Sequence, residues 1–478
     1  MQAALSKHYF SPDKIFHYLF FISGITFIGL AVFTEGNGEG GDSFMHYFFA
    51  RYSWIYPEFF LNHWAKPVFT LFASPFAQFG FTGIKLFNVF VALASCYLAF
   101  LTAKKLEIKY AFLVPLLYLF TRTNVVVTLS GLTEPLFALL LIGSVYLLVC
   151  NKSSAGILIA SFLPFVRSEG LVILCVLFVY LVFTRKIKFI PLLLTGHAVF
   201  ALAGGFYYND LLWVFNRIPY AAMNDHYGHG TWDHFIIHLI FIIGPVLYAL
   251  LIFSGIMQLA GMKKVFKNEV ALKKIVLLFG IFVAFLFAHS AFWALGIFNS
   301  MGMARVFVGV FPVIFLISLD GLDKLTALFS NAMIKTVLVL VFVFSFIIVT
   351  FSDHPSSFRK SDMMVTGSQE MIRSQLIPYL KAKFPGHKIY TSNIDVNFFL
   401  GTNVFDVREY GELKELKPDF RIKKNEVVVW DNWCSVIEEG VSKEALLHSN
   451  QIKMDTTFSG IGYDGSDFQF VTFTTKNK

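Results

Sequence analysis

Charged residues are scarce in this chain of 478 residues: they make up 15% of it, whereas hydrophobic residues make up 56%. A soluble chain of this length would be expected to form about three domains, but so little charge excludes a set of water-exposed domain surfaces. Several uninterrupted apolar stretches reach the roughly 20 residues that a helix needs to cross a bilayer. The sequence therefore predicts an α-helical polytopic membrane protein. The same stretches do not alternate with polar residues, which excludes a transmembrane β-barrel.

Cysteine is rare as well, with four residues in the whole chain. Cys96, Cys150 and Cys175 fall in predicted spans and Cys434 stands alone in the C-terminal region, which excludes a disulfide framework. No small-residue cleavage site follows the first apolar stretch, so we expect a retained span rather than a signal peptide. The net charge of +8 does not predict nucleic-acid binding, because most basic residues occupy short loops, where they set membrane topology.

About eleven apolar segments are candidates for membrane-spanning helices. They cover residues 15–34, 83–103, 110–121, 125–150, 154–166, 169–184, 189–207, 235–260, 275–295, 304–319 and 333–351. The stretch 64–79 is also apolar but contains Pro67 and Pro75. We expect a surface or re-entrant piece there, which is tolerated where it is buried in protein or lines a cavity.

Loop lysines and arginines predict the orientation of the chain. The residues before the first span belong to the lysine-rich set of loops, so the positive-inside rule places the N-terminus in the cytoplasm. The external loop 35–82 and the C-terminal residues then lie outside. Residues 1–351 form the predicted transmembrane domain. Residues 352–478 alternate short apolar runs, such as 388–390, 427–430 and 468–473, with helix-like segments, which predicts a small extracytoplasmic α/β domain.

Polar residues near the spans gather on the outer side, in loops or at outer helix ends. They are Asp42, His46, His63, Lys66, Arg122, Glu134, Arg167, Glu169, His289 and Arg305. Ionisable groups at membrane depth are costly and usually face a cavity or a partner. The sequence therefore predicts a charged cleft that opens outward.

Several short motifs resemble the GT-C superfamily of membrane glycosyltransferases. They are Gly-Gly-Asp42-Ser43 after the first span, His63-Trp-Ala-Lys66-Pro67, Leu132-Thr-Glu134-Pro135, Val166-Arg167-Ser-Glu169-Gly170, and Phe298-Asn-Ser-Met-Gly-Met-Ala-Arg305 before a span with Pro312. The Trp-Trp-Asp signature of oligosaccharyltransferases is absent. The resemblance covers about residues 1–350 and implies a GT-C-like fold, a polyprenyl-phosphate-linked sugar donor and a mannosyltransferase-like activity.

The chemistry of such a transfer matches these residue types. An acceptor hydroxyl must lose a proton, and Asp42 is the candidate general base. The phosphate leaving group must be stabilised, and the candidates are Arg305, Arg167, Arg122 and Lys66. His63, Glu134, Glu169 and His289 are further candidates for substrate binding. A single carboxylate favours inversion at the sugar carbon, and a requirement for a divalent cation, Mg²⁺ or Mn²⁺, stays open.

Each candidate also has a plainer interpretation. Asp42 could cap a helix that begins at Ser43, and Arg305 or Arg122 could extend to lipid headgroups. Glu134 could lock two helices together through an arginine. A lone histidine such as His289 is more often a structural hydrogen-bonding group, although Trp293, four residues later, could stack on a sugar.

The external loop 224–234 offers three histidines and two aspartates. These residue types can bind zinc, but their spacing matches no closed site, so we favour a mobile loop that gates the substrate.

Two other function classes compete with a transferase. A transporter or flippase for polyprenyl-linked glycans or lipids would explain the number of spans, but transporters place polar sites near the membrane midplane and often contain repeats. A scaffold would leave the intramembrane charges unexplained. The acceptor of a transferase would be a lipid glycan or a protein. The compact loops favour a bacterial inner membrane with a periplasmic C-terminal domain.

Overall fold

The computed structural model describes residues 11–38, 40–219, 227–261, 268–416, 422–462 and 465–476. Contacts within the chain divide it into two compact units. Unit 1 comprises Met1–Phe33 and Phe49–Phe358, and unit 2 comprises Thr34–Phe48 and Arg359–Lys478. The beginning of the first loop is therefore grouped with the C-terminal residues rather than with the helices that precede and follow it in the sequence.

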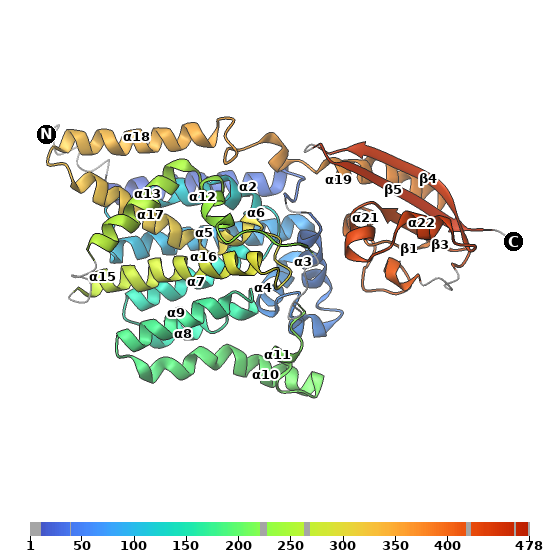
Figure 1. The fold of residues 1–478 in the computed structure, drawn as a ribbon, viewed down its shortest axis with the longest axis horizontal. Coiled ribbons are helices and arrows are strands. Elements are labelled where there is room, and N and C mark those ends of the chain that lie inside the picture. The colour runs from blue at the N-terminus through green and yellow to red at the C-terminus, as the bar shows by residue number, and fades with distance from the viewer. Residues whose placement is uncertain are drawn as a thin grey trace. The chain divides into compact units, whose positions relative to one another are not determined.

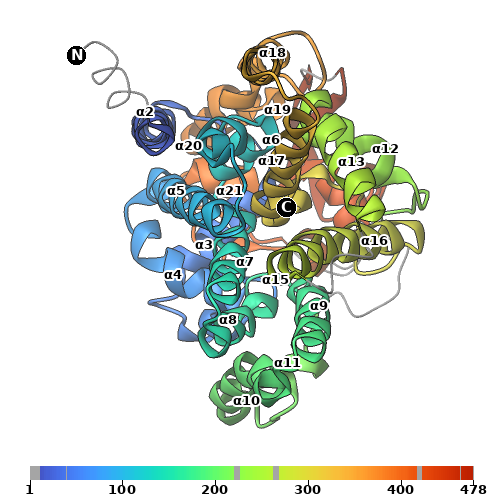
Figure 2. The same cartoon turned by 90° about the vertical axis from the view of Figure 1, so that its left-hand side faces the viewer.

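Long apolar helices form unit 1 and run side by side (Figure 1), and several of them, such as α2 and α18, are seen end on in Figure 2. Among the described residues, six helices are long and apolar enough to cross a membrane, or seven if a bent pair counts as one span. The six are α2 (Pro12–Phe33), α5 (Gly80–Lys105), η5–α10 (Ile187–Tyr208), α15–η6–α16 (Glu269–Ala294), η7–α17 (Ala304–Ala327) and α18 (Ala332–Thr350).

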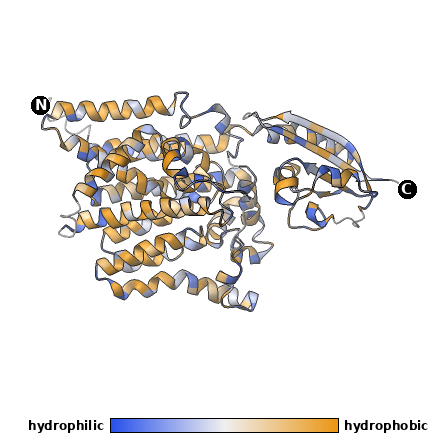
Figure 3. Ribbon diagram, in the orientation of Figure 1, coloured by the Kyte–Doolittle hydropathy of each residue, from blue (hydrophilic) through white to orange (hydrophobic). Residues whose placement is uncertain are grey.

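Shorter helices complete unit 1. They are α3 (Gly41–Tyr52, shared with unit 2), η1 (Pro57–Leu61), α4 (Pro67–Ala77), η2 (Ala111–Leu113), η3 (Pro115–Leu119), α6 (Arg122–Thr128), α7 (Glu134–Val149), α8 (Ser153–Ala160), η4 (Leu163–Phe165), α9 (Gly170–Phe183), α11 (Trp213–Asn216), α12 (His234–Ile243) and α13 (Pro245–Ala260). Figure 3 shows that most of these helices are hydrophobic along much of their length. The apolar composition thus forms a helical bundle, as predicted.

Two predicted spans are broken in the structure. The segment predicted over 125–150 consists of α6 and α7, and α6 belongs with η2 and η3 to the pair that is bent by 66°. The segment predicted over 235–260 is divided at Gly244, which has a φ of +85°. Pro245 follows and begins α13. Hydropathy alone does not reveal such breaks, because the residues on both sides are equally apolar.

Unit 2 contains a five-stranded mixed sheet with the strand order β2-β1-β3-β5-β4. Strand β1 (Lys388–Tyr390) pairs in parallel with β2 (Tyr410–Gly411) and with β3 (Glu426–Asp431), whereas β5 (Asp467–Thr475) pairs antiparallel with β3 and with β4 (Ile452–Ile461). The helical segments are η8 (Lys360–Met363), α19 (Gly367–Met371), η9 (Ile372–Leu376), α20 (Ile377–Lys383), α21 (Ile394–Leu400), η10 (Leu413–Glu415), η11 (Cys434–Glu438) and α22 (Lys443–Leu447).

Strand β3 shows why this sheet lies inside its unit. All six of its residues are buried. Val427 and Val429 pack into one hydrophobic cluster, and Val428 and Trp430 pack into another. This alternation is the period of two expected for a strand that is covered on both faces. The predicted α/β character of the C-terminal region is confirmed. Strand β4 was not predicted, because its mostly polar residues are those of a largely exposed edge strand.

Candidate functional site

Six of the predicted site residues lie together in unit 1, and we call them the Arg167 cluster. Its members are Lys66, which precedes α4, Glu134 in the first turn of α7, Arg167 and Glu169 in the turn between η4 and α9, His289 in α16, and Arg305 in η7. Chain segments more than 200 residues apart in the sequence thus contribute to one site. Each residue stands at or near a helix end, which is where a bundle can present polar side chains outside its apolar interior.

Arg167 is the centre of the cluster. Its Nη1 lies 2.6 Å from Oε1 of Glu134, and its Nη2 donates a hydrogen bond of 2.8 Å to Oε1 of Glu169. The planar guanidinium group suits such a bridge because its donors point in fixed directions. Arg305 lies near the same carboxylate oxygen of Glu134, with 3.8 Å between Nε and Oε1. His289 Nε2 lies 3.7 Å from Oε1 of Glu169.

The cluster carries an excess of positive charge. Three cations, Lys66, Arg167 and Arg305, stand against two carboxylates, Glu134 and Glu169, so the net charge is +1 when His289 is neutral. The Glu134 side chain is fully buried, whereas those of Arg167, Glu169 and Arg305 keep 12% to 16% of their surface exposed. A partly open, cationic site of this kind can accept an anionic group such as a phosphate.

Lys66 is held in an unusual backbone conformation. Its φ of +65° lies in the left-handed region, and the next residue is Pro67. A lysine gains nothing from this conformation, which costs of order 1–3 kcal/mol and recurs at functional sites. Its Nζ donates a hydrogen bond of 3.3 Å to Oγ of Ser168. Burial lowers the pKa of Lys66 to about 8.

His63 lies beside a cavity rather than among the ion pairs. The cavity has a volume of about 250 Å³, and Trp64, Tyr208, Trp213 and Arg217 are among its lining residues. Burial and the nearby Lys66 ammonium lower the pKa of His63 to about 4, so its imidazole is neutral at physiological pH. The guanidinium of Arg217 lies 4.4 Å from the ring centre of Tyr208. Aromatic walls with a cation at the edge are suited to a sugar ring or a phosphate.

Asp42 belongs to unit 2. It lies in the first turn of α3, one residue after the start of the helix at Gly41. A negative charge is favoured there by the helix dipole and by the backbone N–H groups of the first turn. The side chain is half-buried. The helix expected to begin at Ser43 is present and begins at Gly41, and Phe44 and the following aromatic residues are buried within the protein.

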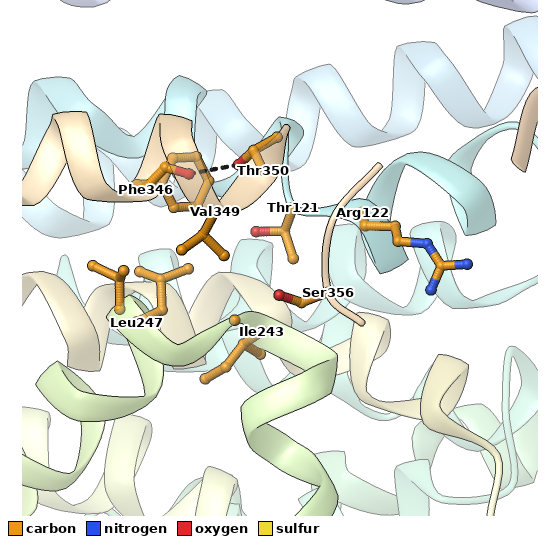
Figure 4. A pocket seen from close by; sticks show the side chains of 10 residues that line it. Thr121, Arg122, Ile243, Leu247, Phe346, Val349, Thr350 and Ser356 are labelled. Carbon is orange, nitrogen blue, oxygen red and sulfur yellow. Dashed lines mark hydrogen bonds between the residues drawn. The ribbon is translucent and has the colours of Figure 1, made fainter. Parts of the chain in front are cut away.

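Arg122 contacts a different part of unit 1. It begins α6, and its Nη1 donates a hydrogen bond of 3.3 Å to the carbonyl oxygen of Pro355. A small pocket beside it is lined by Thr121, Gly244 and Ser356 together with apolar side chains. Figure 4 shows the guanidinium group pointing away from those apolar side chains.

The histidine-rich loop is described only from residue 227 onward, so Asn224, Asp225 and His226 lie outside the described residues. In the described part, His234 Nε2 lies 3.2 Å from the carbonyl oxygen of Gly302, and Gly230 N donates to the carbonyl oxygen of Trp293. Trp293 is therefore covered by this loop. Within the described ranges, no group of three or more His, Cys, Asp or Glu side chains could hold a metal ion.

Two hydroxyl residues that form hydrogen bonds with the Arg167 cluster were not among the predicted site residues. Ser168 accepts the hydrogen bond from Lys66, and Thr133 accepts one of 3.2 Å from Nη1 of Arg167. Both are direct sequence neighbours of predicted charged residues. A small hydroxyl next to a charge at a helix end is the signal that could have identified them.

Comparisons with known proteins find a likeness among solved structures. No family model and no curated protein matches the sequence. Among solved structures, the crystal structure of ArnT from Cupriavidus metallidurans bound to undecaprenyl phosphate is similar, with a TM-score of 0.61 and 11% identity, over 96% of this chain and 97% of that one. The likeness shows a shared fold and confirms the predicted class, a helical polytopic membrane protein with a C-terminal mixed-sheet domain.

Proposed function

We propose that this protein is a membrane glycosyltransferase that moves a hexose, mannose in the first instance, from a polyprenyl-phosphate donor to a lipid glycan or protein. The observation that carries this proposal is the Arg167 cluster, a partly open cationic site at helix ends. The ArnT-like fold supports it, because the ArnT crystal structure holds undecaprenyl phosphate. The GT-C-like motifs in the sequence contain five residues of the Arg167 cluster, namely Lys66, Glu134, Arg167, Glu169 and Arg305.

The donor phosphate is the group that the cluster would bind. As the bond between the sugar C1 and the phosphate oxygen breaks, the leaving polyprenyl phosphate gains a negative charge. Lys66, Arg167 and Arg305 would stabilise this charge through charge-assisted hydrogen bonds. Glu134 and Glu169 would orient Arg167 rather than react, since both are ion-paired to it. His63 would contact the substrate from the aromatic cavity.

Asp42 is the general base in this proposal. It takes the proton of the acceptor hydroxyl while the acceptor oxygen forms its bond to C1 on the face opposite the phosphate. One displacement at C1 inverts the anomeric configuration. The proposal places the reaction on the non-cytoplasmic face, in the periplasm of a bacterium, with the N-terminus of the chain in the cytoplasm.

Turnover by purified protein in nanodiscs tests the proposal. Wild type and Asp42→Asn would receive radiolabelled undecaprenyl-phosphate mannose or glucose with crude membrane acceptors, with and without a chelator to measure any need for Mg²⁺ or Mn²⁺. We expect transfer by the wild type and a loss of at least 100-fold in Asp42→Asn, with unchanged binding of undecaprenyl phosphate. Movement of the lipid across vesicles without any sugar transfer would instead identify a flippase.

A further inference from the structure

The segment that contains Asp42 is attached to the C-terminal domain by contacts within unit 2. Gly36 N donates a hydrogen bond of 3.3 Å to the carbonyl oxygen of Met363. The backbone approach is so close that a Cβ on Gly36 would lie 2.3 Å from the carbonyl oxygen of Met364. Glu35 forms an ion pair with Arg373. Because that pair is largely exposed, it contributes little to stability.

A buried amide network forms the second part of the attachment. Asn37 and Gln369 are each 1% exposed. Gln369 Oε1 accepts a hydrogen bond from the backbone N–H of Thr366, which fixes the orientation of the amide. Its Nε2 then points at two acceptors, Oδ1 of Asn37 at 3.4 Å and Oδ2 of Asp395 at 3.1 Å. Asn37 Nδ2 donates onward to the carbonyl oxygen of Gly40. The network therefore joins the first loop to α19 and α21.

Aromatic packing forms the third part and follows Asp42 in the chain. The ring of Phe44 stacks on Phe398 of α21, with 3.7 Å between the ring centres and 11° between the planes. Tyr47 meets the same ring edge-on. On the other side of Asp42, a Cβ on Gly41 would lie 2.7 Å from Cγ2 of Ile394. Contacts to α21 thus occur both immediately before and shortly after Asp42.

We propose that the C-terminal domain is the element that positions the general base, and that Asn37, Gln369, Asp395 and the α21 side chain Phe398 are positioning residues for Asp42. This inference rests on the proposed function. A catalytic group must be held within about 0.5 Å of its productive place, usually by a supporting shell of hydrogen bonds and packing. A displacement of 1 Å costs on the order of 100-fold in rate.

A compensating pair of substitutions tests the inference. Gly41→Ala introduces a methyl group 2.7 Å from Cγ2 of Ile394, so the contact between the Asp42 segment and α21 must change. We expect kcat to fall by about 100-fold. Ile394→Ala removes the atom that the methyl would meet, leaving Cβ at an ordinary contact distance of 4.0 Å. We expect Ile394→Ala alone to stay within about threefold of wild type and the double variant to recover to the same level. Binding of undecaprenyl phosphate should stay unchanged in all three.

Gln369→Leu provides a second, independent variant, and we expect kcat to fall about tenfold with unchanged lipid binding. Trp430→Phe is its matched control, because it deletes a buried hydrogen bond to the Val441 carbonyl in the same unit but none to residues 34–48. A loss of kcat that follows thermal stability equally in both variants would overturn the inference, as would a double variant no faster than Gly41→Ala. No transfer by wild type would overturn the proposed function itself.

Discussion

Two clusters of charged residues include side chains from the same two spans of unit 1, and they differ in how many of their polar atoms have hydrogen-bond partners. One is the Arg167 cluster. The other, which we call the Asp320 cluster, comprises Asp320, Lys274, Lys324, Ser254 and Gln258. His289 and Lys274 are 15 residues apart on one span, and Arg305 and Asp320 are 15 apart on the other. At 1.5 Å per residue, the Arg167 cluster and the Asp320 cluster are therefore separated by about 22 Å along the helices.

The Asp320 cluster is internally satisfied. Oδ1 of Asp320 accepts from Lys274 at 2.7 Å, and Oδ2 accepts from Ser254 at 3.1 Å and lies 2.7 Å from Nζ of Lys324. Lys324 also donates to Gln258. Every partner comes from α13, α17 or the span that begins with α15. These bonds tie three helices together, and neither oxygen of the carboxylate needs a ligand.

The Arg167 cluster is less complete. Within the described part of the chain, neither oxygen of the buried Glu134 accepts a hydrogen bond of normal geometry, although Arg167 lies close to it, and the same holds for Nε2 of His289. Buried polar atoms are almost always satisfied in a finished interior, and exceptions often mark a site. The comparison teaches that similar charges can be fully paired with one another at one end of a bundle, where they lock helices together, and incompletely satisfied at the other, where we propose the binding site.

The largest expected effect is on stability at the Asp320 cluster. Asp320→Ala leaves two lysines without their buried carboxylate, and we expect the free energy of unfolding to fall by about 3 kcal/mol. Turnover per folded molecule should remain within twofold of wild type. Thermal unfolding in nanodiscs, combined with the transfer assay, measures both quantities. A large loss of turnover with unchanged stability would contradict the structural role of the Asp320 cluster.

The next effect separates the two clusters by activity. Arg305→Gln removes a cation from the Arg167 cluster, and we expect kcat to fall by about 10² to 10³-fold because the leaving phosphate loses a charge-assisted contact. Lys324→Gln removes a cation from the Asp320 cluster, where Lys274 and Ser254 still bind the carboxylate. It should leave kcat within twofold. Equal losses in the two variants would contradict the account.

Lys66 sharpens the comparison because its left-handed backbone conformation lowers the stability of the folded protein. Lys66→Gly relaxes the left-handed residue and removes the ammonium group. We expect unfolding stability to stay equal or to rise by up to about 1 kcal/mol, while affinity for undecaprenyl phosphate falls by ten- to 100-fold. Thermal unfolding measures the stability, and isothermal titration calorimetry measures the affinity for undecaprenyl phosphate. Unchanged affinity would remove Lys66 from the binding site.

The smallest effect is a pH dependence of lipid binding. Burial lowers the pKa of Lys66 to about 8, so its positive charge is lost as the pH rises through 8. We expect affinity for undecaprenyl phosphate to fall by up to about tenfold between pH 7 and pH 9.5. In Lys66→Arg the guanidinium stays charged throughout this range, and the fall should disappear. If affinity depended on pH in the same way in both proteins, Lys66 would be excluded as the source of the pH dependence.

Much of the fold was predictable because it follows from local patterns. Continuous apolar stretches predicted the helical bundle, and the short apolar run 427–430 predicted strand β3, whose side chains are buried on both faces of the sheet. The sequence predicted a boundary between the spans 110–121 and 125–150, close to the bend before Arg122. The breaks between α6 and α7 and at Gly244 were not predicted from hydropathy.

The candidate site was predictable only as a set of residue types. A charge within an apolar segment, such as Glu134, stands out because it is costly there. Its geometry depends on long-range packing, which the sequence does not show: Glu134, Arg167 and Arg305 come from segments up to 171 residues apart. The grouping of residues 34–48 with the C-terminal domain was equally hidden, because Asn37 and Gln369 are ordinary polar residues in the sequence.

Lipid binding by two matched double variants tests the central claim most directly. Lys66→Gln with Arg305→Gln removes two cations from the Arg167 cluster, and Lys274→Gln with Lys324→Gln removes two from the Asp320 cluster. The dissociation constant for undecaprenyl phosphate would be measured in nanodiscs and normalised to folded protein. The account predicts a rise of at least 100-fold in the first variant and no more than twofold in the second. Equal rises, or a larger rise in the second, would contradict it.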